Sequence, residues 1–365
     1  MFLIVTRNFP PDVGGMQVLM AGLSESLLNH GPVKVFTFEH ENSKDYDNKI
    51  PISIIRVKGI KLLRKYRKAN LVNEYIYNNS NIRAIIVDHW KSLELLKDKL
   101  LKKTKTFCLI HSKEINHELG SMTNKRMLKS ISKADFIIAN SNFTKNLATT
   151  VGIDPSRINV IFPGIKEPKK INDKLINEAK EIYKDSFPRI ITVARLDKRK
   201  GHDKILMVIK NLKSKFPKIK YVTIGFGDEE KNLLNLSKEL SLEKDVLFLK
   251  NIDNNLKNSL IAESNLFLMP SRIVKKSVEG FGIVFVEAAS YGVGSIGGKD
   301  GGASDAISHK KTGLICDGNN LESIYDTIID YCSNENFIHY GKNAKIFSEK
   351  FYWESVVKQY IKLLD

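Results

Sequence analysis

Short, continuously apolar runs alternate along the chain with longer stretches in which apolar residues recur every three or four positions. Short continuous runs are typical of strands that are buried on both faces of a sheet. The periodic stretches, of which residues 18–29 and 205–215 are clear examples, predict amphipathic helices. This alternation of strands and helices predicts an α/β fold with parallel sheets and right-handed crossovers.

The predicted strands fall into two series. The first comprises residues 2–6, 33–38, 52–57, 84–87, 106–110 and 136–140, and the second comprises residues 190–193, 221–224, 246–249 and 266–269. Between them lies FPGIKEPKKIN, residues 162–172, whose prolines, glycine and charges are typical of a linker. A length of 365 residues allows two domains. We therefore predict that one domain ends and another begins near residue 168.

The chain carries no sequence signal for a membrane span or for export. No run approaches the roughly 18 consecutive apolar residues of a membrane-spanning helix, and the first apolar run stops at Arg7, which favours a strand over a signal peptide. The cysteines, Cys108, Cys316 and Cys332, form no C-x-x-C pair, and a sparse, odd set is typical of a reducing cytosol. We expect a cytoplasmic protein.

The formal net charge of +17 favours anionic partners such as phosphates, acidic lipid headgroups or nucleic acid. A general enrichment in lysine explains the bulk charge equally well, so local clusters carry more information. No nucleic-acid-binding motif is present, and the basic residues are dispersed rather than interleaved with aromatic residues. We therefore expect no nucleic-acid partner.

In the first half, two features follow predicted strands. Gly14 and Gly15 lie between the first strand and a helix, where backbone N–H groups can approach a phosphate, although a plain tight turn fits as well. This is not the G-x-G-x-x-G pattern of NAD binding. His111 follows strand 106–110, at the edge where ligands bind, and could bond a substrate hydroxyl or be an ordinary loop histidine. His111, Glu114 and His117 lack the H-E-x-x-H spacing, so we expect no metal there.

In the second half, VARLDKRKG places Arg195 and Lys200 between a strand and a helix. Two cations beside a helix N-terminus suit a pyrophosphate, although an exposed basic turn is the alternative. GFGDE, residues 225–229, is a glycine-rich turn of the same kind.

The sharpest motif is EGFGIVFVE, residues 279–287. Glu279 precedes a glycine turn, and the amides of Gly282, Ile283 and Val284 point at whatever lies in front of the helix that begins there. Glu287 follows eight residues after Glu279, so that both carboxylates lie on the same side of a helical segment. Such a pair could hold a sugar at one carboxylate and a ribose at the other, whereas a capped helix with an incidental glutamate is the simpler explanation.

These pieces, taken in order, resemble the family-4 retaining glycosyltransferases of GT-B fold, also called glycosyl transferases group 1. The matching segments are the turn at residues 14–15, VARLDKRKGHD, GFGDE, EGFGIVFVEA, GGASDAI, KTGLICD and FYWESVVKQYIKLL. The resemblance implies two Rossmann-like domains whose parallel sheets face each other across a cleft. It implies an acceptor domain over residues 1–167, a nucleotide-sugar-binding domain over residues 168–348, and a C-terminal helix within 349–365 that crosses back to the N-terminal domain.

The resemblance also implies roles for individual positions. The donor pyrophosphate would be held by Arg195 and Lys200, the donor sugar by Glu279, and the ribose by Glu287. His111 would lie near the transferred sugar. The catalytic set is thus His111, Glu279, Arg195 and Lys200, and the further donor-binding positions are Gly14, Gly15, Lys250, Asn251, Phe281, Gly282, Ile283 and Glu287. No cofactor is expected, because the nucleotide-sugar, such as GDP-mannose or a UDP-sugar, is a substrate.

The chain departs from the family pattern in several places. Gly294 stands where a proline is usual, and the later G-G-x-P-E pattern reads GGASD at residues 301–305. The insertion at residues 272–278 resembles that of phosphatidylinositol-type mannosyltransferases, which favours mannose from GDP-mannose. We expect transfer of a hexose to a glycan or lipid-linked acceptor, as in polysaccharide biosynthesis.

The expected mechanism is a front-face displacement in which cations replace a metal ion at the departing diphosphate. A D-x-D metal motif does occur at Asp45 and Asp47, but its polar surroundings predict a solvated turn. Two other classes of function stay open: a nucleotide-sugar epimerase or hydrolase of the same architecture, and a non-catalytic protein that binds anionic ligands. A phosphorylase would need a lysine for pyridoxal phosphate, which no motif marks.

A basic, partly apolar segment lies at residues 58–71. On a helix it predicts an imperfect amphipathic surface with a cationic face, suited to an anionic membrane. The enzyme could then be peripheral at the inner face of the membrane, whereas an ordinary solvated helix or loop is the alternative. The cations are Lys58, Lys61, Arg64, Lys65, Arg67 and Lys68, and the apolar residues are Ile60, Leu62, Leu63 and Leu71.

Overall fold

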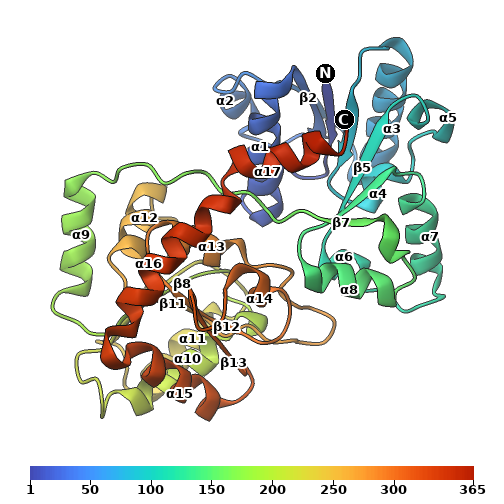
Figure 1. Cartoon of the computed structure of the whole chain (residues 1–365). Coiled ribbons are helices and arrows are strands. Elements are labelled where there is room, and N and C mark those ends of the chain that lie inside the picture. Colours follow the sequence, from blue (N-terminus) through green and yellow to red (C-terminus); the bar gives the residue numbers. More distant parts are fainter. The chain divides into compact units, whose positions relative to one another are not determined.

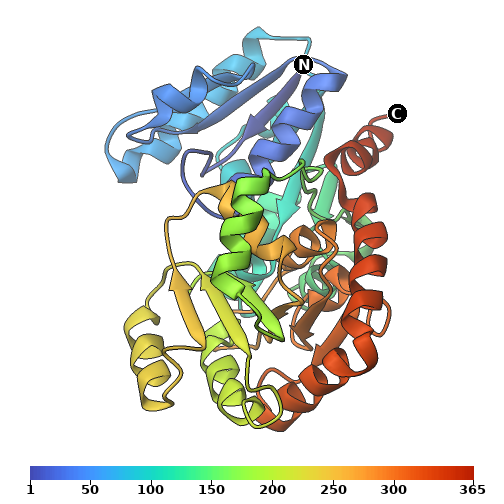
Figure 2. The same cartoon turned by 90° about the vertical axis from the view of Figure 1, so that its left-hand side faces the viewer.

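The computed structural model describes all residues from 1 to 365 and divides into two compact units (Figure 1). The first unit comprises residues 1–166 and 351–365, and the second comprises residues 167–350. Both ends of the chain therefore belong to the first unit, as the turned view also shows (Figure 2). No helix combines the length and the apolar content that crossing a bilayer requires.

The first unit is built on a seven-stranded sheet in the order β3-β2-β1-β4-β5-β6-β7, in which every pairing is parallel. Strands β1 and β4 are buried along their whole length, as their unbroken apolar sequences predict. The strands are β1 (Phe2–Val5), β2 (Val33–Phe38), β3 (Ser53–Val57), β4 (Ala84–Val87), β5 (Lys105–Ile110), β6 (Phe136–Ala139) and β7 (Ile158–Val160).

Helices connect these strands and cover the sheet. They are α1 (Gly15–Leu27), α2 (Ser43–Asp47), α3 (Lys61–Asn78), α4 (Trp90–Leu93), α5 (Asp98–Leu101), α6 (Ser112–Ile115), α7 (Met122–Ile131), α8 (Asn142–Thr150) and, from the end of the chain, α17 (Trp353–Lys362). Helix α17 packs on α1 (Figure 1). A side chain at Gly22 or Gly164 would overlap the indole of Trp353, so these two glycines make room for the returning helix.

The second unit is built on a six-stranded parallel sheet in the order β10-β9-β8-β11-β12-β13. Its strands are β8 (Arg189–Val193), β9 (Lys220–Ile224), β10 (Val246–Leu249), β11 (Leu266–Met269), β12 (Ser295–Gly298) and β13 (Gly313–Cys316). Its helices are α9 (Asp173–Tyr183), α10 (His202–Leu212), α11 (Glu230–Glu239), α12 (Asn254–Ala262), α13 (Ile283–Ser290), α14 (Ala303–Ala306), α15 (Leu321–Cys332) and α16 (Asn336–Ser348).

Each sheet has a point at which the direction of strand addition reverses. In the first unit the chain adds β2 and β3 on one side of β1 and then β4 on the other. In the second unit it adds β9 and β10 on one side of β8 and then β11 on the other. Loops diverge at such a switch point and leave room for a ligand at the carboxyl ends of the strands. Both switch points therefore mark where functional side chains should gather.

The predicted α/β architecture with parallel sheets is confirmed, and each predicted strand is present to within a residue at either end. Three strands lay outside the predicted series. Strand β7 has only three residues and a central Asn159, and β12 and β13 contain glycines in place of an apolar run. In β12, a Cβ on Gly298 would lie 1.8 Å from the carbonyl oxygen of Ser271, so close backbone packing requires a glycine there. Because glycine interrupts the apolar run, the sequence pattern did not predict this strand.

Two local predictions about the first unit are wrong. The segment around Asp45 and Asp47 is the short helix α2 and not a turn. Lys68 does not lie on an exposed cationic face, because it is buried on α3 and only 4% exposed. Its ammonium group reaches the carbonyl oxygen of Thr6 at 2.6 Å, a partner directly after β1 that lies 62 residues away in the sequence.

Candidate functional site

A compact charge cluster lies at the switch point of the second unit. Arg199 and Lys200 follow β8 in a short 3₁₀ turn, and Glu279 follows β11. Arg199 Nη1 donates a hydrogen bond of 2.6 Å to Glu279 Oε2, and Lys200 Nζ donates to the same oxygen. All three side chains are largely buried; that of Lys200 is 11% exposed and that of Glu279 14%. The structure therefore brings two of the predicted catalytic residues, Lys200 and Glu279, into direct contact.

The two cations control the ionisation of Glu279. Burial alone would raise the pKa of this carboxyl, because the charged form loses its hydration. The charges of Lys200 and Arg199, and the hydrogen bonds that they donate, outweigh burial and lower the pKa of Glu279 to about 2. Glu279 is therefore a carboxylate at any physiological pH, able to accept hydrogen bonds from hydroxyl groups.

The turn after Glu279 is fixed by its backbone. Gly282 precedes α13 with a φ of +84°, and a Cβ there would lie 2.6 Å from the ring of Phe285. The carbonyl oxygen of Glu279 accepts a hydrogen bond of 2.9 Å from the amide of Gly302. Consequently the loops after β11 and β12 hold the start of α13 in place, with no side-chain cap on its first amides. Ile283 is the first residue of that helix.

Arg195 lies apart from this cluster. It is exposed in the loop after β8, and its side chain makes no hydrogen bond or ion pair with Glu279. The glycine turn of GFGDE packs against this same loop. A Cβ on Gly225 would lie 1.9 Å from the carbonyl oxygen of Ala194, and one on Gly227 would lie 2.3 Å from that of Leu196. Close packing of two loops thus suffices to explain both glycines.

The remaining predicted donor residues of this unit lie in or just before α13 and directly after β10. Glu287 lies on α13, where burial raises the pKa of its carboxyl and the charge of Lys257 opposes the rise. Phe281 is buried before the helix. Lys250 follows β10 and pairs with Glu230 at 2.8 Å, and Asn251 beside it has a φ of +53°.

In the first unit, Gly14 and Gly15 stand at the start of α1. Gly14 precedes the helix without a side-chain cap, and Gly15 is its first residue. A Cβ on Gly15 would meet no atom within 4 Å, whereas one on Gly14 would lie 2.5 Å from Oε1 of Gln17, so the open space adjoins Gly15. An open helix N-terminus favours an anion, because several N–H groups and the helix dipole point at it.

His111 lies where β5 meets α6, at the carboxyl edge of the first sheet. Its Nε2 is buried without a hydrogen-bond partner, and the ring lines a small cavity together with Asn140 and Tyr360. Burial lowers the pKa of His111 to about 4, although the nearby charge of Asp88 acts in the opposite direction. At neutral pH the ring is uncharged, and Nε2 can donate to or accept from a hydroxyl group.

Sequence reasoning missed an acidic group beside His111. Asp88, directly after β4, accepts hydrogen bonds from Thr6 Oγ1 and Arg7 N at 2.8 Å and from Ser92 Oγ at 2.7 Å. Burial, followed by the charge of Asp88, raises the pKa of Glu114 to about 8, so that Glu114 is mostly protonated at pH 7. The rule that singled out His111, a polar residue directly after an apolar strand, would have found Asp88 as well.

His89, the residue after Asp88, does not form an ion pair with Glu114. Burial, followed by the charge of Arg7, lowers the pKa of His89 to about 2. Although His89 Nε2 lies 3.8 Å from Glu114 Oε2, both groups are therefore uncharged at neutral pH. No group of three or more metal-ligating side chains in the chain could hold a metal ion, and His111, Glu114 and His117 form no such group.

The D-x-D segment has a structural partner. Asp47 accepts hydrogen bonds from Arg56 Nε at 2.9 Å and from Arg56 Nη2 at 2.7 Å. This two-point pairing joins α2 to β3 and occupies both carboxylate oxygens of Asp47. The pairing gives Asp47 a role that needs no metal.

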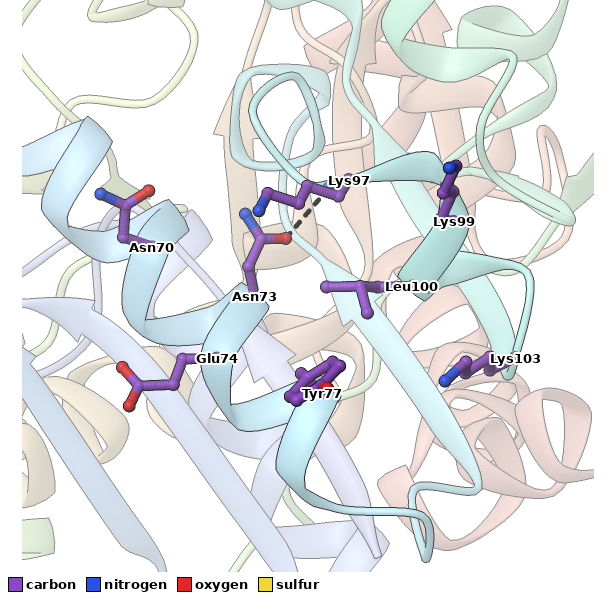
Figure 3. A pocket seen from close by; sticks show the side chains of 8 residues that line it. All are labelled: Asn70, Asn73, Glu74, Tyr77, Lys97, Lys99, Leu100 and Lys103. Carbon is purple, nitrogen blue, oxygen red and sulfur yellow. Dashed lines mark hydrogen bonds between the residues drawn. The ribbon is translucent and has the colours of Figure 1, made fainter.

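One large hollow of the first unit holds none of the predicted site residues. It measures about 580 Å³, lies between α3 and α5, and is shown in Figure 3. Its side chains are Asn70, Asn73, Glu74, Tyr77, Lys97, Lys99, Leu100 and Lys103. Asn73 Oδ1 accepts a hydrogen bond of 3.0 Å from the amide of Lys97 across it. None of these residues directly follows a strand, so this hollow is not the expected position for a ligand.

Comparison with known proteins identifies the family. Residues 173–349 match the family described as glycosyl transferases group 1, and residues 13–167 match glycosyltransferase family 4. The chain belongs to the family-4 glycosyltransferases of GT-B fold. Between them, the two matches cover most of both units of this glycosyltransferase.

Individual relatives agree with this assignment. The chain is 22% identical over 341 residues to the GDP-mannose-dependent alpha-(1-6)-phosphatidylinositol monomannoside mannosyltransferase of Mycolicibacterium smegmatis, covering 90% of this chain and 88% of the relative. It is 31% identical over 250 residues to the N-acetyl-alpha-D-glucosaminyl L-malate synthase of Bacillus anthracis, covering 58% and 63%. The Anabaena protein HepE, solved in complex with UDP, superposes with a TM-score of 0.82 at 18% identity, covering 100% of this chain and 99% of HepE.

These similarities confirm the predicted family, the GT-B fold class and the general activity of a glycosyltransferase. They leave the roles of individual residues as predictions.

Proposed function

We propose that this glycosyltransferase moves a hexose from a nucleotide-sugar to a glycan or lipid-linked acceptor with retention of the anomeric configuration and without a metal ion. The supporting observation is the cluster in which Arg199 and Lys200 converge on Glu279 at the switch point of the second unit. A buried pair of cations beside an uncapped helix N-terminus suits a diphosphate leaving group.

In the proposed reaction, the acceptor hydroxyl attacks the anomeric carbon on the face from which the diphosphate leaves. The C–O bond to the diphosphate breaks, and a phosphate oxygen takes the proton of the attacking hydroxyl. Lys200, with Arg199 beside it, and Arg195 from the loop before them stabilise the negative charge that develops on the diphosphate, assisted by the amides of Gly282 and Ile283. Gly14 and Gly15, at the start of α1, would supply further amides to a phosphate.

The carboxylates and the histidine would position the donor. Glu279, ionised at neutral pH, would accept hydrogen bonds from the sugar hydroxyls, and Glu287 would accept them from the ribose. His111 would bond a hydroxyl of the transferred sugar through its free Nε2. The backbone at Phe281 would line the phosphate and sugar. The base would lie near Lys250 and Asn251, beyond the end of β10.

The proposed donor is GDP-mannose. Relatives that match 90% of the chain are named as GDP-mannose-dependent, which supports mannose from GDP-mannose. HepE was solved with UDP and with UDP-glucose, so a UDP-sugar is the competing donor. Thermal-shift titration of the full chain with GDP, UDP and ADP would rank them, because a ligand that binds only the native state raises its apparent stability.

Independence from metal is supported by two observations. Asp47 of the D-x-D segment is already held by Arg56, and the basic side chains at Glu279 supply the positive charge that a metal ion would otherwise bring. We therefore expect transfer to continue in excess chelator. Loss of activity on chelation, with recovery on addition of Mn²⁺ or Mg²⁺, would overturn this part of the proposal.

We further propose that the enzyme is cytoplasmic and peripheral at the inner face of the membrane. The start of α3 and the residue before it expose Ile60, Leu62 and Leu63, whose exposed fractions are 66%, 80% and 47%. Lys61 and Lys65 are exposed beside them. Apolar and cationic side chains in one exposed segment favour an anionic lipid surface. In co-sedimentation with anionic vesicles, Leu62→Ser/Leu63→Ser should weaken binding, and equal sedimentation with the wild type would count against it.

Product analysis tests the central proposal. The full chain is incubated with GDP-mannose or UDP-glucose, with and without a lipid-linked glycan acceptor, and the anomer of any product is assigned by NMR. Acceptor-dependent transfer with retention is expected. Conversion of the donor alone would instead support an epimerase or hydrolase, and nucleotide binding without turnover would support a non-catalytic binding protein.

A further inference from the structure

A second pocket of the first unit, about 520 Å³ in volume, lies at the switch point between β1 and β4. Val5 and Arg7 reach it from the end of β1, Phe38 from the end of β2, and Ser92 from the helix after β4. The first half of α3 forms one side. We call it the cationic pocket, because its lining includes Arg7, Lys61, Arg64, Lys65, Lys68, Lys91 and Arg126.

The charges of the cationic pocket are not balanced. Glu94 is its one acidic lining residue, and Arg126 binds both oxygens of that carboxylate, at 2.9 and 3.1 Å. The other six basic side chains make no ion pair. Asp88 lies near Arg7 and Lys68 but outside the lining, and its oxygens already accept three hydrogen bonds. An excess of unpaired positive charge therefore surrounds an open space.

Lys68 gives the clearest sign that an anion belongs in this space. Its ammonium group donates to the carbonyl oxygen of Thr6 and lies 4.4 Å above the ring of Phe38. Burial lowers the pKa of Lys68 to about 8; the charge of Asp88 opposes the shift and that of Arg7 adds to it. A buried ammonium with one hydrogen bond has donors left for a ligand.

Arg64, one turn before Lys68 on α3, repeats this arrangement. Its guanidinium lies 5.1 Å from the centre of the same Phe38 ring, and its Nε is buried without a hydrogen-bond partner. Across the pocket, Lys91 is near Arg7, and burial followed by that charge lowers the pKa of Lys91. Cations are thus held close together on both sides of the pocket although they repel one another.

We propose that the cationic pocket binds a phosphate group carried by the acceptor, so that the acceptor of this glycosyltransferase is a phosphorylated molecule. The inference rests on the proposed function and adds the acceptor's chemical class. A phosphate fits better than a single carboxylate, because it offers more oxygens and more negative charge to several converging cations. The pocket also lies at the carboxyl ends of the strands, where ligands bind in this fold.

Direct binding tests the proposal without knowledge of the complete acceptor. Glycerol 3-phosphate is titrated into the full chain by calorimetry, with glycerol as the uncharged control. The pocket variant is Arg64→Gln/Lys91→Gln. The matched control is Lys99→Gln/Lys103→Gln, which removes the same charge from exposed lysines at the hollow of Figure 3. Circular dichroism and Tm verify that both variants fold.

We expect glycerol 3-phosphate to bind the wild type and the control variant with the same affinity. Its affinity for the pocket variant should be lower by about tenfold or more. Glycerol should bind none of them. Equal affinity in the pocket and control variants would overturn the proposal, since general positive charge would then explain the binding. Absence of binding by the wild type would overturn it too.

Vesicles distinguish a lipid phosphate from a soluble one. Phosphatidylcholine vesicles with and without phosphatidylglycerol are co-sedimented with each protein. Binding that needs phosphatidylglycerol, is lost in the pocket variant and is competed by glycerol 3-phosphate assigns the pocket to a lipid headgroup. Binding of glycerol 3-phosphate without pocket-dependent vesicle binding assigns it to a soluble phosphorylated acceptor. Both results support a phosphate site.

Lys200→Ala separates this proposal from the proposed donor site. If the cationic pocket is a site of its own, Lys200→Ala should bind glycerol 3-phosphate as the wild type does while losing affinity for nucleotide. Loss of glycerol 3-phosphate binding in Lys200→Ala would overturn the acceptor inference, because the phosphate would then occupy the donor site. If nucleotide fails to bind the wild type, the proposed function fails, whatever the pocket variant does.

Discussion

The two switch points are built alike but balance their charge differently. In the second unit, Arg199 and Lys200 are paired with Glu279. In the first unit, cations such as Arg64 and Lys68 surround a pocket in which they have no carboxylate partner. A paired cluster is stable without ligand and can exchange one anion for another, whereas an unpaired cluster is destabilised until an anion arrives. The difference suits a donor diphosphate at one and an acceptor phosphate at the other.

A glutamate near each switch point shows the same contrast. The pKa of Glu279 is lowered to about 2, because the adjacent cations outweigh its burial. The pKa of Glu114 is raised to about 8, mainly by burial and then by the charge of Asp88. One buried glutamate is therefore ionised at neutral pH and the other is mostly protonated. Glu279 accepts hydrogen bonds from two cations, whereas the Oε2 atom of Glu114 has no hydrogen-bond partner, and this difference decides between the two states.

The largest expected effect comes from removing a cation of the paired cluster. Lys200→Ala should lower kcat about 100- to 1000-fold, since the loss of one donor to a developing anion costs about 2.7–4 kcal/mol. Arg195→Ala should cause a comparable loss if that side chain also reaches the diphosphate. Steady-state transfer assays measure both, with Lys198→Ala, an exposed neighbour, as the control. Near-normal turnover in both variants would contradict the proposal that these side chains stabilise the departing diphosphate.

Removing the carboxylate of Glu279 should leave unpaired cations at the switch point of the second unit, as at that of the first. Glu279→Ala leaves Arg199 and Lys200 without their carboxylate, which should lower the free energy of unfolding by about 3 kcal/mol. Pyrophosphate should restore part of the loss. The contribution of Glu279 is present above the unfolded pKa of 4.5 and declines as pH falls toward 2, so wild type and variant should converge in acid.

Urea unfolding at several pH values measures this effect. Glu230→Ala is the control, because Glu230 pairs with Lys250 at an exposed position, where such pairs contribute about 0–1 kcal/mol. An equal loss in both variants would mean that the buried pair contributes no more than a surface pair.

The protonated glutamate of the first unit predicts a pH dependence of the opposite sign. Glu114 is protonated in the folded chain up to about pH 8 but ionises at about 4.5 when unfolded. Its stabilising contribution is therefore complete below pH 4.5 and declines as pH rises to about 8, by up to about 1.4 kcal/mol per pH unit. Glu114→Gln keeps the shape and cannot ionise, so its Tm should rise relative to the wild type across this window.

The exposed Glu118 supplies the comparison for that experiment. Glu118→Gln should follow the wild type at every pH. A constant difference between Glu114→Gln and the wild type from pH 5 to 8 would show that Glu114 is already ionised in the folded protein.

The smallest expected effect is a gain in stability from the unpaired pocket. Arg7→Gln removes one of the repelling cations and should stabilise the protein without ligand by about 0.2–1 kcal/mol at low salt. The gain should vanish near 1 M salt, where charges are screened within about 3 Å. Arg83→Gln is the matched substitution, and it should lower stability slightly, because Arg83 is paired with Asp365 at 2.9 Å. A loss of stability in Arg7→Gln would indicate that its charge is compensated.

The sequence by itself determined most of the strands and pointed to the carboxyl edge of each sheet as the place for a site. Unbroken apolar runs identified β1 and β4, the polar residue directly after β5 led to His111, and the basic turn between β8 and α10 led to Lys200. The EGFG turn marked Glu279 and the start of α13. These features depend on periodicity and on turn chemistry, which are local properties of a chain.

Only the tertiary structure decided which residues meet. The sequence singled out Arg195 with Lys200, but Arg199 is the arginine that contacts Glu279, 80 residues further along. Likewise, Lys68 belongs to a segment that looked like an exposed cationic face, yet its side chain turns inward to Thr6, directly after β1. The reason is physical: these contacts depend on strand order, which places β11 beside β8, and on the packing of α3 over β2 and β3. No local pattern encodes the distance between residues on different elements.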